Sequence, residues 1–401
     1  MNVKIFPPTQ LPAQIALPSS KSVAGRALVV RSLMKGKFEF ENMPDCDDTK
    51  ALRDAILSVE SGKTEHINVE GAGTAMRFLT ALLAVTEGEY VIDGNERMRQ
   101  RPIGELVTAL KSLGADIVYL GEEGFPPLRI SGKHLNGGSV TVRGDISSQF
   151  VSALLLIAPT MERGLEILLT NGISSRPYID LTLDVMRDFG AKATWTARDT
   201  LTVEPTPYIY NKESYAIEAD WTAASYWFAM QYMLKHSSDG LISFCNLTKN
   251  RQGDSIVSLL FRLMGERDVF EFDFKDNPDL VQTMAVCCCA CNKSFRFTGL
   301  QSLHIKETDR IVALQKELVK CGYNVTVESD KMSFDASRPS QTRKHASVEI
   351  DTYGDHRMAM AFATLAIKRP GLVINDAEVV NKSYPNFWHD LQQAGFEIFE
   401  C

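Results

Sequence analysis

One pattern decides the fold, and it is clearest in Ile103-Gly-Glu-Leu-Val-Thr-Ala-Leu-Lys-Ser-Leu-Gly114, which is followed by Ala-Asp-Ile-Val-Tyr-Leu up to residue 120. The apolar residues of the first part recur at the three- and four-residue spacing of an amphipathic helix, and Gly114 suits the left-handed turn that often ends a helix. The second part has the residue types of a short strand. We therefore expect one helix–glycine–strand unit here.

The same unit occurs six times along the chain, and such internal repeats decide the architecture of a fold. The other five amphipathic helices begin near Asp48, Ile179, Ser255, Arg310 and Phe387. The glycines that end the helices at 62, 114 and 190 recur at 265, 322 and 395, so each pair is separated by close to half of the 401 residues. Strands are expected at 115–120, 191–195, 269–274, 323–327 and 396–399. The sequence therefore predicts two similar halves of three units each.

Each unit also contains a second helix that is apolar on nearly every side. These helices are expected at 23–30, 75–84, 150–158, 223–230, 281–290 and 358–367. A helix without a polar face is buried on all sides. Three such helices in each half predict an α/β (α+β) fold of inside-out type, in which helices form the core and the strands and amphipathic helices surround them.

Composition excludes several classes of protein. The chain has 43 Lys+Arg and 50 Asp+Glu, a net charge of −7, which argues against a broad basic surface for nucleic acid or anionic lipid. No apolar stretch reaches the ~18 residues of a membrane span. The first residues have neither the apolar run of a signal peptide nor the composition of a transit peptide. We expect a cytoplasmic protein that binds neither nucleic acid nor membranes.

Four of the eight cysteines occur together, in Met284-Ala-Val-Cys-Cys-Cys-Ala-Cys291. Their spacing is unlike the paired spacing of a zinc site. They lie in an apolar stretch, where a free cysteine behaves as a small hydrophobic residue. We therefore expect a buried helix here, and no metal or cofactor.

Small hydroxyl residues and glycines open five of the buried helices. The openings are Ser19-Ser-Lys-Ser22, Gly71-Ala-Gly-Thr74, Gly144-Asp-Ile-Ser-Ser-Gln149, Asp220-Trp-Thr222 and Gly354-Asp-His-Arg357. Each opening alone is typical of an N-cap. However, Lys21, Arg77 and Arg357 lie at these same openings, and a cation there opposes the helix dipole unless an anion lies between them. Together the openings predict sites for phosphate or carboxylate groups, and so one or two small anionic ligands.

Six motifs identify a family resemblance over residues 18–385. They are Pro18-Ser-Ser-Lys-Ser-Val-Ala-Gly-Arg26, Gly71-Ala-Gly-Thr-Ala-Met-Arg77, Arg99-Gln-Arg-Pro-Ile-Gly104, Ser147-Ser-Gln149, Lys306-Glu-Thr-Asp-Arg310 and Gly354-Asp-His-Arg-Met-Ala-Met360. With these motifs in this order, the chain resembles the 5-enolpyruvylshikimate-3-phosphate (EPSP) synthase family. The resemblance implies two domains of three units around parallel inner helices, with the active site in the cleft between them. It implies one domain of residues 1–12 plus 214–401, in which the N-terminal segment returns to the C-terminal half, and another of residues 13–213.

The resemblance also implies an activity and its partners. The family moves the enolpyruvyl group of phosphoenolpyruvate to the 5-hydroxyl of shikimate 3-phosphate and releases phosphate, by addition and elimination through a tetrahedral intermediate. It implies a monomeric transferase of the shikimate pathway, which leads to chorismate and the aromatic amino acids, and a target of glyphosate.

The family's site residues are carried over motif by motif. For shikimate 3-phosphate the resemblance implies Lys21, Ser22, Arg26, Ser147, Ser148, Gln149, Ser175, Asp220 and Lys306, with Tyr178 beside them. For phosphoenolpyruvate it implies Lys21, Gly73, Arg101, Gln149, Arg310, Arg357 and Lys382. The catalytic groups it implies are Lys21, Asp220 and Glu307, and which of them is acid and which is base stays open. The chain departs from the usual family residues at Gly25, Gly71, Phe78, Trp221 and Ser302.

Two alternatives are weighed against this function. The related enzyme that adds enolpyruvyl to UDP-N-acetylglucosamine carries a reactive cysteine on a loop of its first half and lacks the Lys306-Glu-Thr-Asp-Arg310 motif, whereas the first half of this chain has only Cys46, just before a helix. A repeat scaffold without catalytic activity would be expected to have lost Lys21, Asp220 or Glu307, and all three are present.

Overall fold

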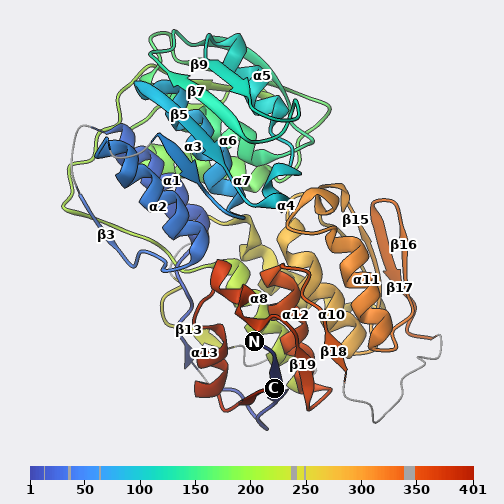
Figure 1. Ribbon diagram of the computed structural model, residues 1–401. Coiled ribbons are helices and arrows are strands. Elements are labelled where there is room, and N and C mark those ends of the chain that lie inside the picture. The colour runs from blue at the N-terminus through green and yellow to red at the C-terminus, as the bar shows by residue number, and fades with distance from the viewer. Residues whose placement is uncertain (13, 35–37, 63–64, 236–241, 248–249, 338–347) are drawn as a thin grey trace. The chain divides into compact units, whose positions relative to one another are not determined.

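The computed structural model describes residues 1–12, 14–34, 38–62, 65–235, 242–247, 250–337 and 348–401. The chain forms two compact units (Figure 1). Unit 1 comprises Met1–Pro18 and Ala219–Cys401, and unit 2 comprises Ser19–Glu218. Each unit has its own hydrophobic core.

Three apolar helices form the centre of unit 2 and pack against one another. They are α1 (Lys21–Leu33), α3 (Gly73–Val85) and α6 (Ser148–Ile157). The more amphipathic helices of this unit are α2 (Asp47–Glu60), α5 (Gly104–Ser112) and α7 (Arg176–Asp188), and a short α4 covers Glu96–Arg99. In α6 every residue from Phe150 to Ile157 is buried, as its lack of a polar face predicts.

The strands of unit 2 surround these helices as two four-stranded sheets and one parallel pair. The first sheet has the order β4 (His66–Asn68), β5 (Gly88–Asp93), β7 (Leu128–Gly132), β6 (Asp116–Tyr119). The second has the order β8 (Gly138–Arg143), β9 (Leu165–Thr170), β11 (Thr200–Val203), β10 (Ala193–Trp195). The parallel pair is β3 (Glu39–Glu41) with β12 (Ser214–Ala216).

Unit 1 repeats this arrangement of helices. Its central helices α8 (Trp221–Lys235), α10 (Val281–Ala290) and α12 (His356–Thr364) pack against one another (Figure 1). The amphipathic helices are α9 (Val257–Glu266), α11 (Arg310–Lys320) and α13 (Phe387–Gln393). Cys287, Cys288 and Cys289 are buried in α10, as the apolar sequence around them predicts.

The described residues of unit 1 also form two four-stranded sheets and one parallel pair. The first sheet has the order β14 (Val269–Asp273), β15 (Ser294–Thr298), β17 (Lys331–Phe334), β16 (Val325–Glu328). The second has the order β18 (Glu349–Ile350), β19 (Leu372–Ile374), β1 (Val3–Phe6), β20 (Glu397–Glu400). The parallel pair is β2 (Gln14–Ile15) with β13 (Ser243–Phe244).

All four larger sheets share one topology. In each, a parallel pair is extended by two further strands that pair antiparallel. In three sheets the strands come from one continuous segment, but in the fourth the N-terminal strand β1 takes the third position, between β19 and β20. The predicted α/β fold of inner helices surrounded by sheets is thereby confirmed for each unit.

The borders of the units lie a few residues beyond the predicted ones, which were 12/13 and 213/214. Residues up to Pro18 remain with unit 1 because β2 pairs with β13 and the Leu17 amide donates to Asn246 Oδ1 at 2.9 Å. Residues up to Glu218 remain with unit 2 because β12 pairs with β3. Pairings between residues so far apart in sequence could not be read from the local pattern.

One predicted helix end is wrong. Gly265 was expected to end its helix in the left-handed conformation, as Gly114 does with a φ of 97°. Instead α9 continues to Glu266, and Arg267 follows in an extended conformation. Among the helices of the described residues, none is both long enough and apolar enough to cross a membrane.

Candidate active site

The start of α1 in unit 2 presents Lys21 beside a carboxylate. Ser20 is the N-cap, and its hydroxyl accepts a hydrogen bond from the Val23 amide. Lys21 is the first residue of the helix, and its Nζ lies 2.6 Å from Asp48 Oδ2 on the neighbouring α2. Both side chains are largely buried, with exposed fractions of 15% and 10%. The ion pair holds the Lys21 ammonium group at the helix start.

Arg26, one turn further along α1, is buried among neutral groups. Its guanidinium donates to Thr182 Oγ1 at 2.7 Å, to Ser152 Oγ at 3.3 Å and to the backbone carbonyls of Ser22 and Tyr178. Its only ring contact in the described part of the chain is the face of Phe78, 5.6 Å away. Burial lowers the pKa of Arg26 to about 10, so the group remains charged at neutral pH. A buried cation with neutral partners is well suited to an anion.

The start of α3 brings Gly73 against a second buried arginine. The residue before the helix is Ala72, which provides no capping side chain. A Cβ atom on Gly73 would lie 2.5 Å from Arg101 Nη1, so only glycine leaves room for this guanidinium. Arg101 is 7% exposed, and its Nε has no hydrogen-bond partner among the described residues. Arg77 Nη1 lies beneath, donating to the Gly73 carbonyl at 3.2 Å.

The other predicted residues of unit 2 lie at the starts of α6 and α7. Ser147 is the N-cap of α6 and accepts from the Gln149 amide, and Gln149 Nε2 donates to Thr74 Oγ1 on α3 at 3.1 Å. Ser175 precedes α7 in a left-handed conformation with a φ of 57°, and it is 6% exposed. Arg26 connects these elements, because it donates to Ser152 of α6 and to the Tyr178 carbonyl of α7.

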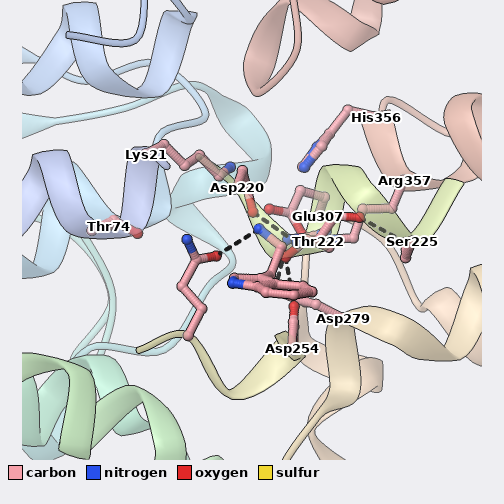
Figure 2. A network of polar contacts seen from close by, with 12 residues as sticks. Lys21, Thr74, Asp220, Thr222, Ser225, Asp254, Asp279, Glu307, His356 and Arg357 are labelled. Carbon is pink, nitrogen blue, oxygen red and sulfur yellow. Dashed lines mark hydrogen bonds and ion pairs between the residues drawn. The ribbon is translucent and has the colours of Figure 1, made fainter. Parts of the chain in front are cut away.

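In unit 1 the predicted cations lie in one network of carboxylates, partly drawn in Figure 2. Arg310, the first residue of α11, is 2% exposed and contacts three acids. Its Nε lies 2.6 Å from Asp355 Oδ2, its Nη1 2.8 Å from Asp279 Oδ1 and its Nη2 2.7 Å from Glu307 Oε2. Burial alone would lower the pKa of Arg310, but the three carboxylates outweigh burial and raise it.

Asp279 connects Arg310 to the second arginine of this network. Arg357 lies in the first turn of α12, and its Nη2 is 2.7 Å from Asp279 Oδ2. Burial alone would raise the pKa of Asp279, but Arg357, Lys306 and Arg310 outweigh it and hold the pKa well below its ordinary value. Asp279 is therefore ionised at neutral pH.

The remaining predicted residues of unit 1 differ from one another in their contacts. Lys382, at the end of a 3-10 turn (Ala377–Lys382), lies 3.9 Å from Glu307 Oε1. Lys306 follows another 3-10 turn (Gln301–Ile305) and acts on Asp279 through its charge. Asp220 is 8% exposed and accepts a hydrogen bond from the Thr222 amide on Oδ1 at 2.9 Å, at the start of α8. This contact is that of a helix cap.

Asp279 was missed by the analysis of the sequence, although a signal was present. The sixth buried helix, α10, also has a polar opening, Asn277-Pro-Asp279, which is not among the five predicted anion sites. The repeat predicts that this opening is equivalent to the others. In the structure it supplies the carboxylate that holds both Arg310 and Arg357.

The fold and these residues define a class of protein. Buried cations lie at helix starts in both units, and carboxylates lie beside several of them. Among the described residues, no group of three or more His, Cys, Asp and Glu side chains could hold a metal ion. The arrangement is that of an enzyme that binds small phosphorylated acids and has side chains in place to move protons.

Comparison with known proteins identifies the family. Residues 56–391 match the family model described as EPSP synthase (3-phosphoshikimate 1-carboxyvinyltransferase). The 3-phosphoshikimate 1-carboxyvinyltransferase of Bacteroides fragilis strain YCH46 is 45% identical, over 99% of each chain, and that of Aliivibrio fischeri strain MJ11 is 34% identical, over 98% of this chain and 99% of its own. The chain belongs to the EPSP synthase family. A solved EPSP synthase structure from Acinetobacter baumannii has the same fold, with a TM-score of 0.77 at 18% identity and full coverage of both chains.

Proposed function

We propose that this chain transfers the enolpyruvyl group of phosphoenolpyruvate to the 5-hydroxyl of shikimate 3-phosphate and releases phosphate. Membership of the EPSP synthase family supports this reaction. The structural observation that carries it is the buried Arg101 guanidinium, held against the uncapped start of α3 at Gly73. Backbone N–H groups at a helix start and an adjacent guanidinium together bind a phosphate or carboxylate group.

Phosphoenolpyruvate carries a phosphate and a carboxylate, and the proposal assigns cations of both units to it. In unit 2 these are Lys21 and Arg101, with the Gly73 amide and Gln149 beside them. In unit 1 they are Arg310, Arg357 and Lys382. The proposal requires residues of both units to act on one substrate, and the location of the site in a cleft between them stays a prediction.

Shikimate 3-phosphate is assigned mainly to unit 2. Ser22, Ser147, Ser148 and Ser175 lie at helix starts, where their hydroxyls and the helix N–H groups suit a phosphate. Arg26 supports this assignment, because a fully buried cation with neutral partners favours an anion nearby. The proposed set for shikimate 3-phosphate is completed by Gln149, Tyr178, Lys21, Asp220 and Lys306.

The reaction requires three proton movements. As the 5-hydroxyl oxygen attacks C2 of phosphoenolpyruvate, the hydroxyl loses its proton and the methylene carbon gains one. The resulting tetrahedral intermediate then loses a methyl proton as phosphate leaves. In the proposed mechanism, Asp220 acts on the attacking hydroxyl. Glu307 and Lys21 act on the protons that the methylene carbon gains and loses. Glu307 suits this role because it contacts Arg310 and Lys382, the cations assigned to phosphoenolpyruvate.

Asp279 extends this set of carboxylates. It contacts both Arg310 and Arg357, two of the cations assigned to phosphoenolpyruvate. Its strongly lowered pKa suits a group that orients cations and accepts a hydrogen bond from substrate while remaining ionised. We therefore include Asp279 with Asp220 among the carboxylates to be tested.

Phosphate release tests the proposed function directly. The protein is mixed with phosphoenolpyruvate and shikimate 3-phosphate, and phosphate is measured over time. Turnover is expected only with both substrates. No turnover with this pair, together with phosphate release from phosphoenolpyruvate and UDP-N-acetylglucosamine, would favour the related enzyme instead. No release with either acceptor would favour a scaffold without catalytic activity.

Replacement of Arg101 tests the assignment of substrates. Arg101→Met is expected to raise the KM for phosphoenolpyruvate far more than that for shikimate 3-phosphate, and equal effects on both would contradict the assignment. The family resemblance also supports a cytoplasmic location and a monomeric state. Light scattering during size-exclusion chromatography tests the oligomeric state, and a stable dimer would contradict the monomer.

A further inference from the structure

Glu317 is a buried acid of unit 1 to which neither the sequence motifs nor the proposed mechanism gives a role. It lies on α11, and its side chain is fully buried. Tyr353 donates its hydroxyl to Glu317 Oε1 at 2.6 Å, and the Asp351 amide donates to Oε2 at 3.2 Å. Lys320 Nζ lies 2.9 Å from Oε2. Because a buried carboxylate without partners is costly, Glu317 and these donors hold one another in place.

Two of the donors belong to the loop 351–355, which joins β18 to α12. The backbone of this loop is strained at Tyr353, whose φ of 55° lies in the left-handed region that a bulky side chain rarely adopts. Gly354 follows with a φ of 66°. A strained conformation persists only where surrounding contacts hold it. The hydrogen bond from Tyr353 to Glu317 is such a contact.

The same loop ends at a carboxylate of the arginine network. Asp355 is the N-cap of α12, and its Oδ1 accepts from the Arg357 amide at 2.9 Å. Its Oδ2 lies 2.6 Å from Arg310 Nε. Arg310 and Glu317 are seven residues apart on α11, about two helical turns, and so lie on one face of this helix. Glu317 therefore holds the first part of the loop to this face, and Arg310 holds its end.

We propose that Glu317 and Tyr353 are positioning residues for the binding of phosphoenolpyruvate: their hydrogen bond fixes the strained loop, and so fixes Asp355 and the two arginines that it contacts. The inference rests on the proposed assignment of Arg310 and Arg357 to phosphoenolpyruvate. Neither Glu317 nor Tyr353 needs to touch a substrate, since both act through Asp355.

A tyrosine of unit 2 provides a matched control. Tyr215 donates its hydroxyl to Asp188 Oδ2 at 2.9 Å, a bond of the same kind. Tyr215 lies in β12 and Asp188 at the end of α7, and neither element carries a cation assigned to phosphoenolpyruvate. Tyr353→Phe and Tyr215→Phe each remove one hydroxyl that donates to a carboxylate. Only Tyr353→Phe releases the loop before α12.

Steady-state kinetics with both substrates compares the two variants. For Tyr353→Phe we expect the KM for phosphoenolpyruvate to rise about fivefold or more. Its kcat should stay within about twofold of the wild type, because the two arginines bind this substrate before and during the reaction alike. The KM for shikimate 3-phosphate should also stay within about twofold, as should all three constants in Tyr215→Phe.

Two results of this comparison would contradict the positioning role. The first is a lower kcat of Tyr353→Phe at an unchanged KM for phosphoenolpyruvate, since partial unfolding alone reduces the amount of active enzyme. The second is an equal KM for phosphoenolpyruvate in Tyr353→Phe and Tyr215→Phe, which would show that the bond to Glu317 has no special effect.

Replacement by glycine separates the hydrogen bond from the backbone strain. Glycine adopts a φ of 55° without steric cost, so Tyr353→Gly removes the strain together with the bond to Glu317. Its KM for phosphoenolpyruvate should be raised at least as far as in Tyr353→Phe. A KM equal to that of the wild type would overturn the proposal, because it would show that the backbone conformation is sufficient without the bond.

A variant of Glu317 shows whether the two residues act together. Glu317→Met removes the acceptor and the buried charge and keeps a side chain of similar length. The double variant with Tyr353→Phe should have the same KM for phosphoenolpyruvate as Glu317→Met alone, because Tyr353 then has no acceptor to lose. Increases in KM that multiply in the double variant would show that the two residues act independently, against the proposal.

Hydrogen exchange separates this inference from the proposed function. The amides of Asp355 and Arg357 donate to the Thr352 carbonyl and to Asp355 Oδ1. Both should exchange faster in Tyr353→Phe than in Tyr215→Phe, whether or not the wild type releases phosphate. If the wild type is inactive, the function fails, and the exchange then decides whether the hydrogen bond orders the loop. Equal exchange in both variants would refute the inference even in an active enzyme.

Discussion

The two units hold their buried cations in opposite ways. In unit 2, Arg26 donates to hydroxyls and carbonyls, and Arg101 lies against the start of α3. In unit 1, Arg310 contacts three carboxylates and Arg357 contacts Asp279. The cations of unit 2 thus favour the arrival of an anion, whereas those of unit 1 are already balanced by acids.

This difference indicates that the two units have different roles, although they share one repeated fold. An anion that enters unit 2 meets uncompensated positive charge, which favours tight binding. An anion that enters unit 1 must share its cations with carboxylates, so unit 1 combines binding with groups that can exchange protons. Lys21 of unit 2 is intermediate, because it is paired with Asp48.

The largest expected effect is on turnover. Asp220→Ala is expected to lower kcat roughly a hundred- to ten-thousand-fold, the usual contribution of a group that transfers a proton. Because the phosphate and carboxylate groups of both substrates are assigned to other residues, binding of both substrates should change little. Kinetics and calorimetric titration measure the two effects. A variant that retains most of its activity would remove Asp220 from the mechanism, and Asp279→Ala would be the next to examine.

The second prediction compares stability between the units. Arg310→Met leaves Asp355, Asp279 and Glu307 without their shared cation, and breaking a buried ion pair costs about 3 to 5 kcal/mol. Arg26→Met should cost less, about 1 to 3 kcal/mol, because only neutral acceptors lose a donor.

Denaturant unfolding near pH 7 measures this contrast. The deficit of Arg310→Met should shrink as the pH falls, because the carboxylates left behind become protonated. An equal loss of stability in Arg310→Met and Arg26→Met would contradict the distinction between the units.

The third prediction concerns pH and the Asp254 carboxyl. Burial, together with the negative charge of Asp279, raises the pKa of Asp254 to about 6 from an ordinary value of 3.8. An acid whose pKa is higher in the folded state destabilises the fold when ionised, so this cost is present above about pH 6 and is gone below the ordinary value. Asp254→Asn should therefore be more stable than the wild type at pH 8, by about 1 to 3 kcal/mol.

Unfolding at pH 8 and at pH 4 checks this sign. The gain in Asp254→Asn should nearly vanish at pH 4, where the wild-type carboxyl is protonated in the folded protein. A gain that is the same at both values would show that the carboxyl does not titrate in this range.

The smallest expected effect distinguishes two glycines of unit 2. A Cβ at Gly73 would meet the tip of Arg101 at 2.5 Å, and this flexible tip can move aside at little cost to the fold. Gly73→Ala should therefore raise the KM for phosphoenolpyruvate about tenfold, the effect of about 1.4 kcal/mol, with little change in stability. A Cβ at Gly25 meets its nearest atoms only at 3.5 to 3.8 Å, so Gly25→Ala is the matched control. Equal KM values in the two variants would show that Arg101 does not depend on Gly73.

Much of the fold could be predicted because it follows from local sequence patterns. The central helices are apolar on all sides, and their positions were predicted to within a few residues. The place of β1 between β19 and β20 was not visible in this way, and only the family resemblance implied that the N-terminal segment joins the C-terminal half. The predicted end of α9 was wrong because glycine at position 265 is compatible with a helix interior as well as with a helix end.

The residues of the candidate site could be predicted better than the contacts that they make. Motifs indicated Arg26, Arg310 and Arg357, but not that the first would lie among neutral acceptors and the other two among acids. Those partners come from helices distant in sequence. Asp254 and its bond to Thr222 had no sequence signal of this kind, because a single acid in a turn is typical of a solvated loop.

The central claim is that helix starts of both units, with their buried cations, bind two small phosphorylated acids. A crystal structure with shikimate 3-phosphate and phosphoenolpyruvate bound tests it most directly. The account predicts the phosphoenolpyruvate anion groups on Arg101, Arg310 and Arg357, and shikimate 3-phosphate beside Ser147 and Arg26. Well-ordered substrates bound away from these arginines, with Arg26 and Arg101 in contact with neither, would contradict it.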